Sequence, residues 1–205
     1  MSGWWVHQLW QQGRATELVA WIFWVIASIT LHELAHGWVA TAEGDDTPKK
    51  LGRLTANPVV HMGVPSIVLF LLIGIAWGLM PINPRKFRHG RLGRILVSLA
   101  GPAMNIVLAL IALAGIRLGA TGELRAFLFV GGYLNIVLFA FNLIPIPPLD
   151  GSTVLRALSP AIARLYTRPQ AGLFGMALLL VVFLSGLGNS LFVAAQNLAA
   201  AIAGL

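Results

Sequence analysis

The chain has 205 residues, of which 58% are hydrophobic and only 10% charged, and it contains no cysteine. Soluble domains average about a quarter charged residues, so this composition predicts an integral membrane protein. The lack of cysteine excludes disulfides and thiolate metal ligands. The net charge of +7 does not indicate nucleic-acid binding, because the basic residues fall in short connections between apolar runs, a pattern typical of membrane topology.

Apolar segments occur along the whole chain, and several reach the roughly 20 residues that a helix needs to cross a bilayer. We expect membrane helices at residues 18–42, 64–82, 95–118, 127–146, 171–187 and 189–204. The predicted fold class is an all-α polytopic membrane protein with about five to six membrane segments. It forms one domain, residues 1–205, made of an interfacial segment (1–17), a core (18–150) and C-terminal membrane segments (171–204). Three tryptophans favour the interfacial location of the first segment: Trp4, Trp5 and Trp10.

The basic residues predict the topology. Eleven of the 14 lie in three polar connections, at residues 43–63, 83–94 and 147–170. The positive-inside rule places these connections in the cytoplasm, so segment 64–82 would begin and end on the same side. Four residues that interrupt helices favour a re-entrant hairpin there: Pro65, Gly74, Gly78 and Pro81. The alternative is a simple crossing with residues 43–63 outside.

Three ionisable side chains lie within the first apolar segment: His32, Glu33 and His36. Ionisable groups are costly at membrane depth and usually mark a functional site. Histidines at positions i and i+4 lie on one helical face, where they can share a metal ion, and the glutamate between them can act as a general base. The motif therefore predicts a metal-dependent hydrolase, with internally packed histidines as the alternative.

A catalytic zinc site needs three protein ligands and an open position. Candidates for the third ligand are the remaining acidic and histidine side chains: Glu43, Asp45, Asp46, His61, His89, Glu123 and Asp150. Asp150 follows the fourth apolar segment, which runs towards the side where the first one ends, so its depth matches that of the histidines. We expect Asp45, Asp46, His61 and His89 to be solvated.

The approach to Asp150 contains Pro145, Pro147 and Pro148. Proline cannot continue a helix, and it restricts the preceding residue to extended conformations. We therefore expect the fourth helix to unwind near Ile144 and a short extended segment to deliver Asp150 to the site. The alternative is that Asp150 is the N-cap of a following helix.

Four motifs occur in order: HELAHG at 32–37, LGRLTANP at 51–58, GPAMN at 101–105 and NLIPIPPLDG at 142–151. Together they resemble the site-2 protease family of intramembrane zinc metalloproteases, in its compact form without PDZ or CBS domains. The resemblance covers residues 20 to 185. The chain departs from it at Gly63, where small members often carry an acidic residue two positions after the histidine that matches His61.

The resemblance implies that His32, His36 and Asp150 bind one Zn²⁺ and that Glu33 is the catalytic glutamate. Asn142 matches a polar position near the site, where its amide would stabilise the developing oxyanion or fix the substrate backbone. Asn105 matches another such position, with no role assigned.

The expected function is that of a zinc-dependent intramembrane endopeptidase, which hydrolyses peptide bonds within or near transmembrane segments in regulated intramembrane proteolysis. The substrate would bind in extended conformation, by pairing with strand-like backbone in 51–58. The protein would lie in the cell membrane with its active site towards the cytoplasm, with lipid and a membrane protein as partners and no nucleic acid. The alternative is a non-enzymatic membrane metal-binding or transport protein with the same ligands. The oligomeric state stays open.

Overall fold

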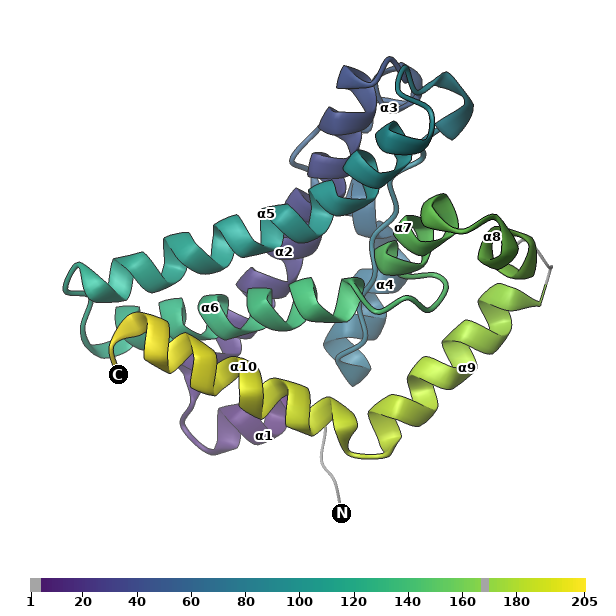
Figure 1. The fold of residues 1–205 in the computed structure, drawn as a ribbon. Coiled ribbons are helices and arrows are strands. Elements are labelled where there is room, and N and C mark those ends of the chain that lie inside the picture. Colours follow the sequence, from purple (N-terminus) through teal and green to yellow (C-terminus); the bar gives the residue numbers. More distant parts are fainter. Residues whose placement is uncertain (1–4, 167–169) are drawn as a thin grey trace.

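The computed structural model describes residues 5–166 and 170–205, which form helices and turns without a β-strand (Figure 1). Trp4 and Arg168 lie outside the described residues. The helices are α1 (Trp5–Gln11), α2 (Ala15–Ala42), α3 (Thr47–Lys50), α4 (Pro58–Ile73), the 3₁₀ turn η1 (Pro84–Lys86), α5 (Arg91–Arg117), α6 (Gly122–Asn142), α7 (Asp150–Leu158), α8 (Pro160–Tyr166), α9 (Ala171–Leu184) and α10 (Leu187–Ala203). The all-helical prediction is confirmed.

Three helices, α2, α5 and α6, are long and apolar enough to cross a membrane, and they pack against one another to form the core. Small residues allow close contact between them. A Cβ at Gly131 of α6 would clash with the indole of Trp24, whose Nε1 donates to the Phe127 carbonyl over 3.0 Å. These helices make the chain a multi-pass membrane protein and form the frame on which the site is built.

The segment predicted at 64–82 is half helix and half extended chain. α4 begins after Asn57, whose side chain accepts a hydrogen bond from the Val59 amide, and it ends at Gly74 in the left-handed conformation. The chain then runs back along α4. Its return is fixed by a hydrogen bond from the Leu79 amide to the His61 carbonyl, 3.0 Å, and by two bonds between Trp77 and the Ser66 hydroxyl. Residues 74–83 therefore return to the level of the first turn of α4.

The C-terminal helices form an arm around the core. α10 packs along α6 and α5, whereas α9 diverges from them and joins α10 to α8 (Figure 1). Most of the α9 side chains that the structure describes are exposed. This arm returns to the core at the turn before α7, which carries Asp150.

Of the two predicted extended segments, one forms no strand and the other is wrong. Residues 51–57 hold a turn at 51–52 and then irregular chain up to the N-cap of α4, without a strand. Residues 143–149 leave the helix as expected, because α6 ends at Asn142, but they form successive tight turns. Asp150 is also not an N-cap: the N-cap is Leu149, and Asp150 is the first residue of α7.

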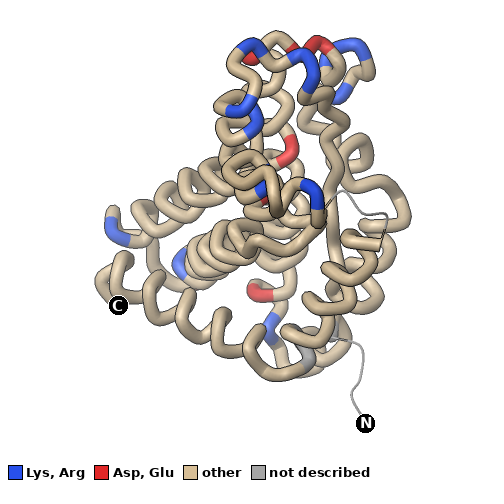
Figure 2. The backbone as a smooth tube through the Cα atoms, turned by 45° about the vertical axis from the view of Figure 1, so that its right-hand side comes forward, with Lys and Arg blue, Asp and Glu red and all other residues tan. Residues whose placement is uncertain are grey.

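Charged residues gather along the chain at the end of the molecule where α3 lies (Figure 2). Asp45, predicted in solvent, is fully buried there and accepts hydrogen bonds from the amides of Asn83 (2.6 Å) and Thr47 (3.0 Å). Asp46 is exposed and pairs with Lys50 and Lys86. These contacts attach the basic loop 83–94 to the turn after α2.

Candidate active site

The two histidines of the HELAH motif lie on one face of α2, in its last three turns, and both are buried. Their Nε2 atoms are 3.0 Å apart and their ring centroids 4.7 Å apart. Because the helix places them one turn apart, both rings lie on the same face. That face is turned towards α5, where His32 contacts Asn105 and His36 contacts Val97. The spacing of the motif therefore produces the pair that it predicted.

Asp150, from the first turn of α7, completes the cluster. Its Oδ2 lies 3.1 Å from the Nε2 of His32 and 3.3 Å from the Nε2 of His36. In the part of the chain that the structure describes, this is the one group of three acidic or histidine side chains whose ligand atoms can share a metal ion. The structure thus brings Asp150 next to His32 and His36, as predicted, although more than half of the chain separates His32 from Asp150.

The hydrogen bonds of the two histidines decide which ring nitrogens carry protons. His36 Nδ1 lies 2.6 Å from the carbonyl oxygen of Val97, which can only accept, so Nδ1 is the donor. A neutral imidazole has one N–H, so the Nε2 of His36 presents a lone pair to the centre of the cluster. His32 also carries its proton on Nδ1, and two asparagines determine this choice.

A chain of amides orients His32. Asn135 Nδ2 donates to the Gly131 carbonyl, 2.9 Å, which turns its Oδ1 towards Asn105. Asn105 Nδ2 donates to that oxygen over 2.9 Å, so its own Oδ1 faces His32 Nδ1 at 2.7 Å. His32 Nδ1 is therefore the donor and its Nε2 carries a lone pair. Both asparagines are fully buried.

Three lone-pair atoms thus converge at 3.0 to 3.3 Å: two imidazole Nε2 atoms and the Asp150 Oδ2, which is buried and accepts no hydrogen bond. With both imidazoles neutral, acceptors at this distance repel one another unless a proton or a metal ion lies between them. Neutral imidazoles and a carboxylate are ligands that zinc prefers, and the second ring nitrogen of each histidine is hydrogen-bonded as in metal sites. The residues therefore fit a zinc ion.

Gly101 of α5 forms the wall of this cluster. A Cβ at this position would clash with the Nε2 atoms of His32 and His36. The glycine of the GPAMN motif is therefore required by the approach of the imidazoles to α5, and the asparagine of the same motif binds one of them.

Glu33 is also buried, and it faces the return segment after α4. A Cβ at Gly78 would lie 2.6 Å from its Cγ and 2.7 Å from its Oε1. The absence of a side chain at Gly78 makes room for the carboxylate beside the histidines. Extended backbone and the candidate general base are thus in direct contact.

The remaining predicted residues lie elsewhere or act differently. Asn142 is the last residue of α6, and its amide donates to the Leu138 carbonyl of the same helix, 2.9 Å. His61 was predicted in solvent but is buried: its Nε2 donates to the Thr55 carbonyl, 2.6 Å, while its Nδ1 has no hydrogen-bond partner among the described residues. His89 is exposed as predicted and pairs with Glu43. Glu123 is exposed at the start of α6.

Sequence reasoning assigned no role to Asn135. The sequence did carry a signal for Asn135, because an amide within the apolar run 127–146 needs a hydrogen-bond partner at membrane depth.

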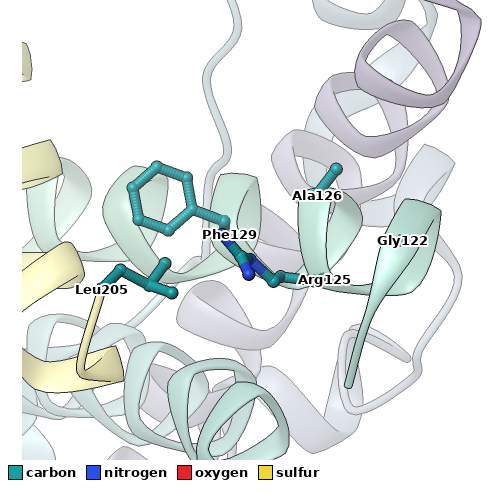
Figure 3. Close-up of a pocket in the computed structure, with 5 residues that line it drawn as sticks. All are labelled: Gly122, Arg125, Ala126, Phe129 and Leu205. Atoms are coloured by element: carbon teal, nitrogen blue, oxygen red, sulfur yellow. The ribbon is translucent and has the colours of Figure 1, made fainter. Parts of the chain in front are cut away.

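The pocket in Figure 3 lies at the N-terminal end of α6, lined by Gly122, Arg125, Ala126, Phe129 and Leu205. It is separate from the cluster, since Asp150 follows the other end of that helix.

The fold and the site define a class: a polytopic membrane protein with a His–His–Asp cluster that could hold a metal ion. Residues 117–185 match the model of Peptidase family M50. The chain is 42% identical over 177 residues to "Putative zinc metalloprotease YwhC" of Bacillus subtilis, covering 80% of each chain. It is 33% identical over 181 residues to "Putative zinc metalloprotease Rip2" of Mycobacterium tuberculosis, covering 82% of this chain and 68% of the relative.

A third relative is "Zinc metalloprotease MJ0392" of Methanocaldococcus jannaschii, which is 29% identical over 176 residues, covering 81% of this chain and 44% of the relative. No solved structure matches the chain. The chain belongs to peptidase family M50, the site-2 protease family, as the four motifs predicted. It is a zinc metalloprotease, and this sets aside the metal-transport alternative.

Proposed function

We propose that the protein is an intramembrane endopeptidase, which hydrolyses peptide bonds within or near transmembrane segments of other membrane proteins in regulated intramembrane proteolysis. The observation that carries this proposal is the cluster of His32, His36 and Asp150 beside Glu33. These four groups lie on or against α2, one of the three helices long enough to span a membrane. A peptide bond cleaved there must itself be at membrane depth.

His32, His36 and Asp150 are the proposed zinc ligands, with one ion per chain. When bound, zinc supplies Lewis-acid chemistry, which makes water more acidic and polarises a carbonyl oxygen. Glu33 accepts a proton from the attacking water and returns it to the leaving amine, the usual role of a general acid–base group. Asn142 is the proposed donor to the substrate backbone or the oxyanion, which requires that its amide leave the Leu138 carbonyl.

The proposed substrate segment is extended, because a helical peptide bond is shielded by its own turn. The return segment at residues 74–83 supports this proposal. It is non-helical, it lies against Glu33 through Gly78, and it is free of the regular backbone bonding of a helix or sheet. An extended peptide paired with this segment would place its backbone beside the general base.

The proposed topology has five to six membrane segments in the cell membrane, with residues 64–82 as a re-entrant hairpin and the active site towards the cytoplasm. Two observations support it. The chain reverses at Gly74 and returns along α4. The basic loop 83–94 is bound to the turn that follows α2, so both belong to one side, and the positive-inside rule makes that side cytoplasmic.

Two variants test the proposal when the full chain is purified in bilayers with a peptide that contains a transmembrane segment. Glu33→Gln should bind zinc like the wild type and lose at least about a hundredfold in cleavage rate, since it removes only the base. Asp150→Ala should lose both zinc and cleavage. Cleavage by Glu33→Gln at the wild-type rate, or zinc bound normally by Asp150→Ala, would overturn the assignment.

A further inference from the structure

The turns that carry Asp150 hold few backbone hydrogen bonds of their own. Three of the seven residues 143–149 are prolines, which have no N–H to donate. Within these turns the amide of Ile146 donates to Ile144, 2.8 Å, and that of Leu149 donates to the Ile146 carbonyl, 2.9 Å. The carbonyls of Pro145 and Pro147 are left for other elements to contact.

Those contacts come from the C-terminal arm. The hydroxyl of Tyr166, the last residue of α8, donates to the Pro145 carbonyl over 2.6 Å. Gly175 of α9 lies directly against the carbonyl of Pro147, two residues further on: a Cβ added there would clash with the Pro147 carbonyl oxygen, lie 2.9 Å from its carbon and 3.3 Å from the Ile146 Cγ2. Two helices of the arm therefore contact two carbonyls of the turn, those of Pro145 and Pro147.

Gly175 is buried in a helix whose described side chains are mostly exposed. Its neighbours Phe174 and Met176 are 71% and 62% exposed. Figure 1 shows α9 diverging from α5 and α6. The contact of Gly175 with Pro147 joins this helix to the turn that carries Asp150.

We propose that Gly175 and Tyr166 are positioning residues that hold the turn 143–149, and with it the carboxylate of Asp150, against the two imidazoles. Metal ligands tolerate displacements of only about 0.2 Å from ideal distances. Leu149 is bonded to Ile146, which Gly175 contacts, and it directly precedes Asp150. A shift of Pro147 therefore displaces the carboxylate. This inference rests on the proposed ligand role of Asp150.

A matched pair of glycine substitutions in α9 tests it. Gly175→Ala introduces a methyl group against a backbone carbonyl, while Gly172→Ala, one turn away, meets nothing within 4 Å. Both replace a helical glycine by alanine, which favours the helix in each case, and only Gly175→Ala also introduces a contact with the turn. Tyr166→Phe removes the second contact and leaves its ring in place.

The readout is zinc affinity of the full-length protein, measured by competition with a chromophoric chelator, with far-ultraviolet circular dichroism as the check on folding. We expect Gly175→Ala to weaken zinc binding by about tenfold or more, Tyr166→Phe to weaken it less, and Gly172→Ala to match the wild type. In the cobalt-substituted protein, the visible absorption of Gly175→Ala should shift, because the spectrum reports ligand geometry.

Asp150→Ala distinguishes a failure of the proposed ligand role of Asp150 from a failure of the positioning role of Gly175 and Tyr166. Normal zinc binding by Asp150→Ala removes the ligand role and the proposed function with it. If Asp150→Ala loses zinc while Gly175→Ala and Tyr166→Phe bind it like the wild type, the positioning role alone is overturned. A loss equal in Gly172→Ala and Gly175→Ala also overturns it, because the effect would then come from the helix and not from its contact with Pro147.

Discussion

His32 Nδ1 and Asn105 Oδ1 lie 2.7 Å apart in the buried core, and this hydrogen bond joins α2 to α5 at the candidate metal site. It also fixes the ring of His32 with its Nε2 lone pair towards Asp150. The bond depends on Asn135, because the contact of Asn135 with the Gly131 carbonyl determines how both amides are turned.

Replacing either asparagine by leucine should therefore weaken zinc binding without removing a ligand. For Asn105→Leu we expect a loss of about 10- to 100-fold, the range typical of residues that orient metal ligands. Asn135→Leu should give a smaller loss, since Asn105 remains but can rotate its amide. Chelator competition measures both. The double variant should be no worse than Asn105→Leu alone, and strictly additive losses would show that the two amides act separately.

Adding one methyl group at Gly101 should disrupt the centre from the other side. Gly101→Ala places a Cβ against both Nε2 atoms, and α5 cannot move away because it is packed against α2 and α6. We expect zinc content after dialysis to fall well below one ion per chain. Gly172→Ala serves as the control. A Gly101→Ala protein that retains a full equivalent of zinc would show that the close approach of the imidazoles to Gly101 is not needed for zinc binding.

A methyl group at Gly78 should separate binding from catalysis. Its Cβ would displace the Glu33 carboxylate, which is not a proposed ligand, so zinc content should stay at the wild-type level while the cleavage rate drops. The expected loss is about 10- to 100-fold, less than for removal of a general base. Metal analysis and peptide cleavage on the same sample measure the two quantities. Parallel losses of zinc and cleavage would show that Gly78 supports the whole site.

The basic loop 83–94 should detach in acid. The hydrogen bond from the His89 side chain lowers the pKa of Glu43 from 4.5, and pairing with Lys50 and Lys86 lowers the pKa of Asp46 from 3.8 to about 2. A carboxyl whose pKa is lowered on folding stabilises the folded state fully above its ordinary pKa, and this contribution is lost as pH falls through the lowered value. The attachment should therefore be complete above about pH 5 and weaken progressively towards about pH 2.

Hydrogen exchange at the amides of Arg88 and His89, corrected for its intrinsic pH dependence, measures this detachment. The His89 amide donates to the Glu43 carboxylate, and the Arg88 amide donates to the backbone carbonyl of the same residue. Glu43→Gln should exchange faster than the wild type at neutral pH and show a weaker acid transition. Protection that stays constant down to pH 2 would argue against the role of these carboxylates.

The sequence predicted the parts of the structure that depend on local pattern. Apolar length located α2, α5 and α6, and helical spacing placed His32 and His36 on one face. The prolines correctly predicted that α6 ends before Asp150. A single proline is tolerated inside α4 and α5, whereas three prolines within residues 145–148 remove too many N–H donors for a helix to continue. The match in membrane depth then selected Asp150 among the acidic residues.

What could not be predicted depends on contacts between distant segments. The tight turns at 143–149 replace the expected extended chain, and Gly151 packs so closely on them that a Cβ there would clash with the Leu143 carbonyl. Asp45 and His61 looked like loop residues, but the return segment and the loop 83–94 fold over them. The partner of Asn135 is Asn105 on another helix, and one sequence does not specify how α5 and α6 are rotated against each other.

The long separation between His32 and Asp150 along the chain has a consequence during biosynthesis. A nascent chain that has not yet emerged past residue 150 holds two imidazoles and no carboxylate, and the helices that brace the Asp150 turn follow later still. With Asp150 as the proposed third ligand, the metal site is therefore incomplete while the first helices of the chain are inserted into the bilayer.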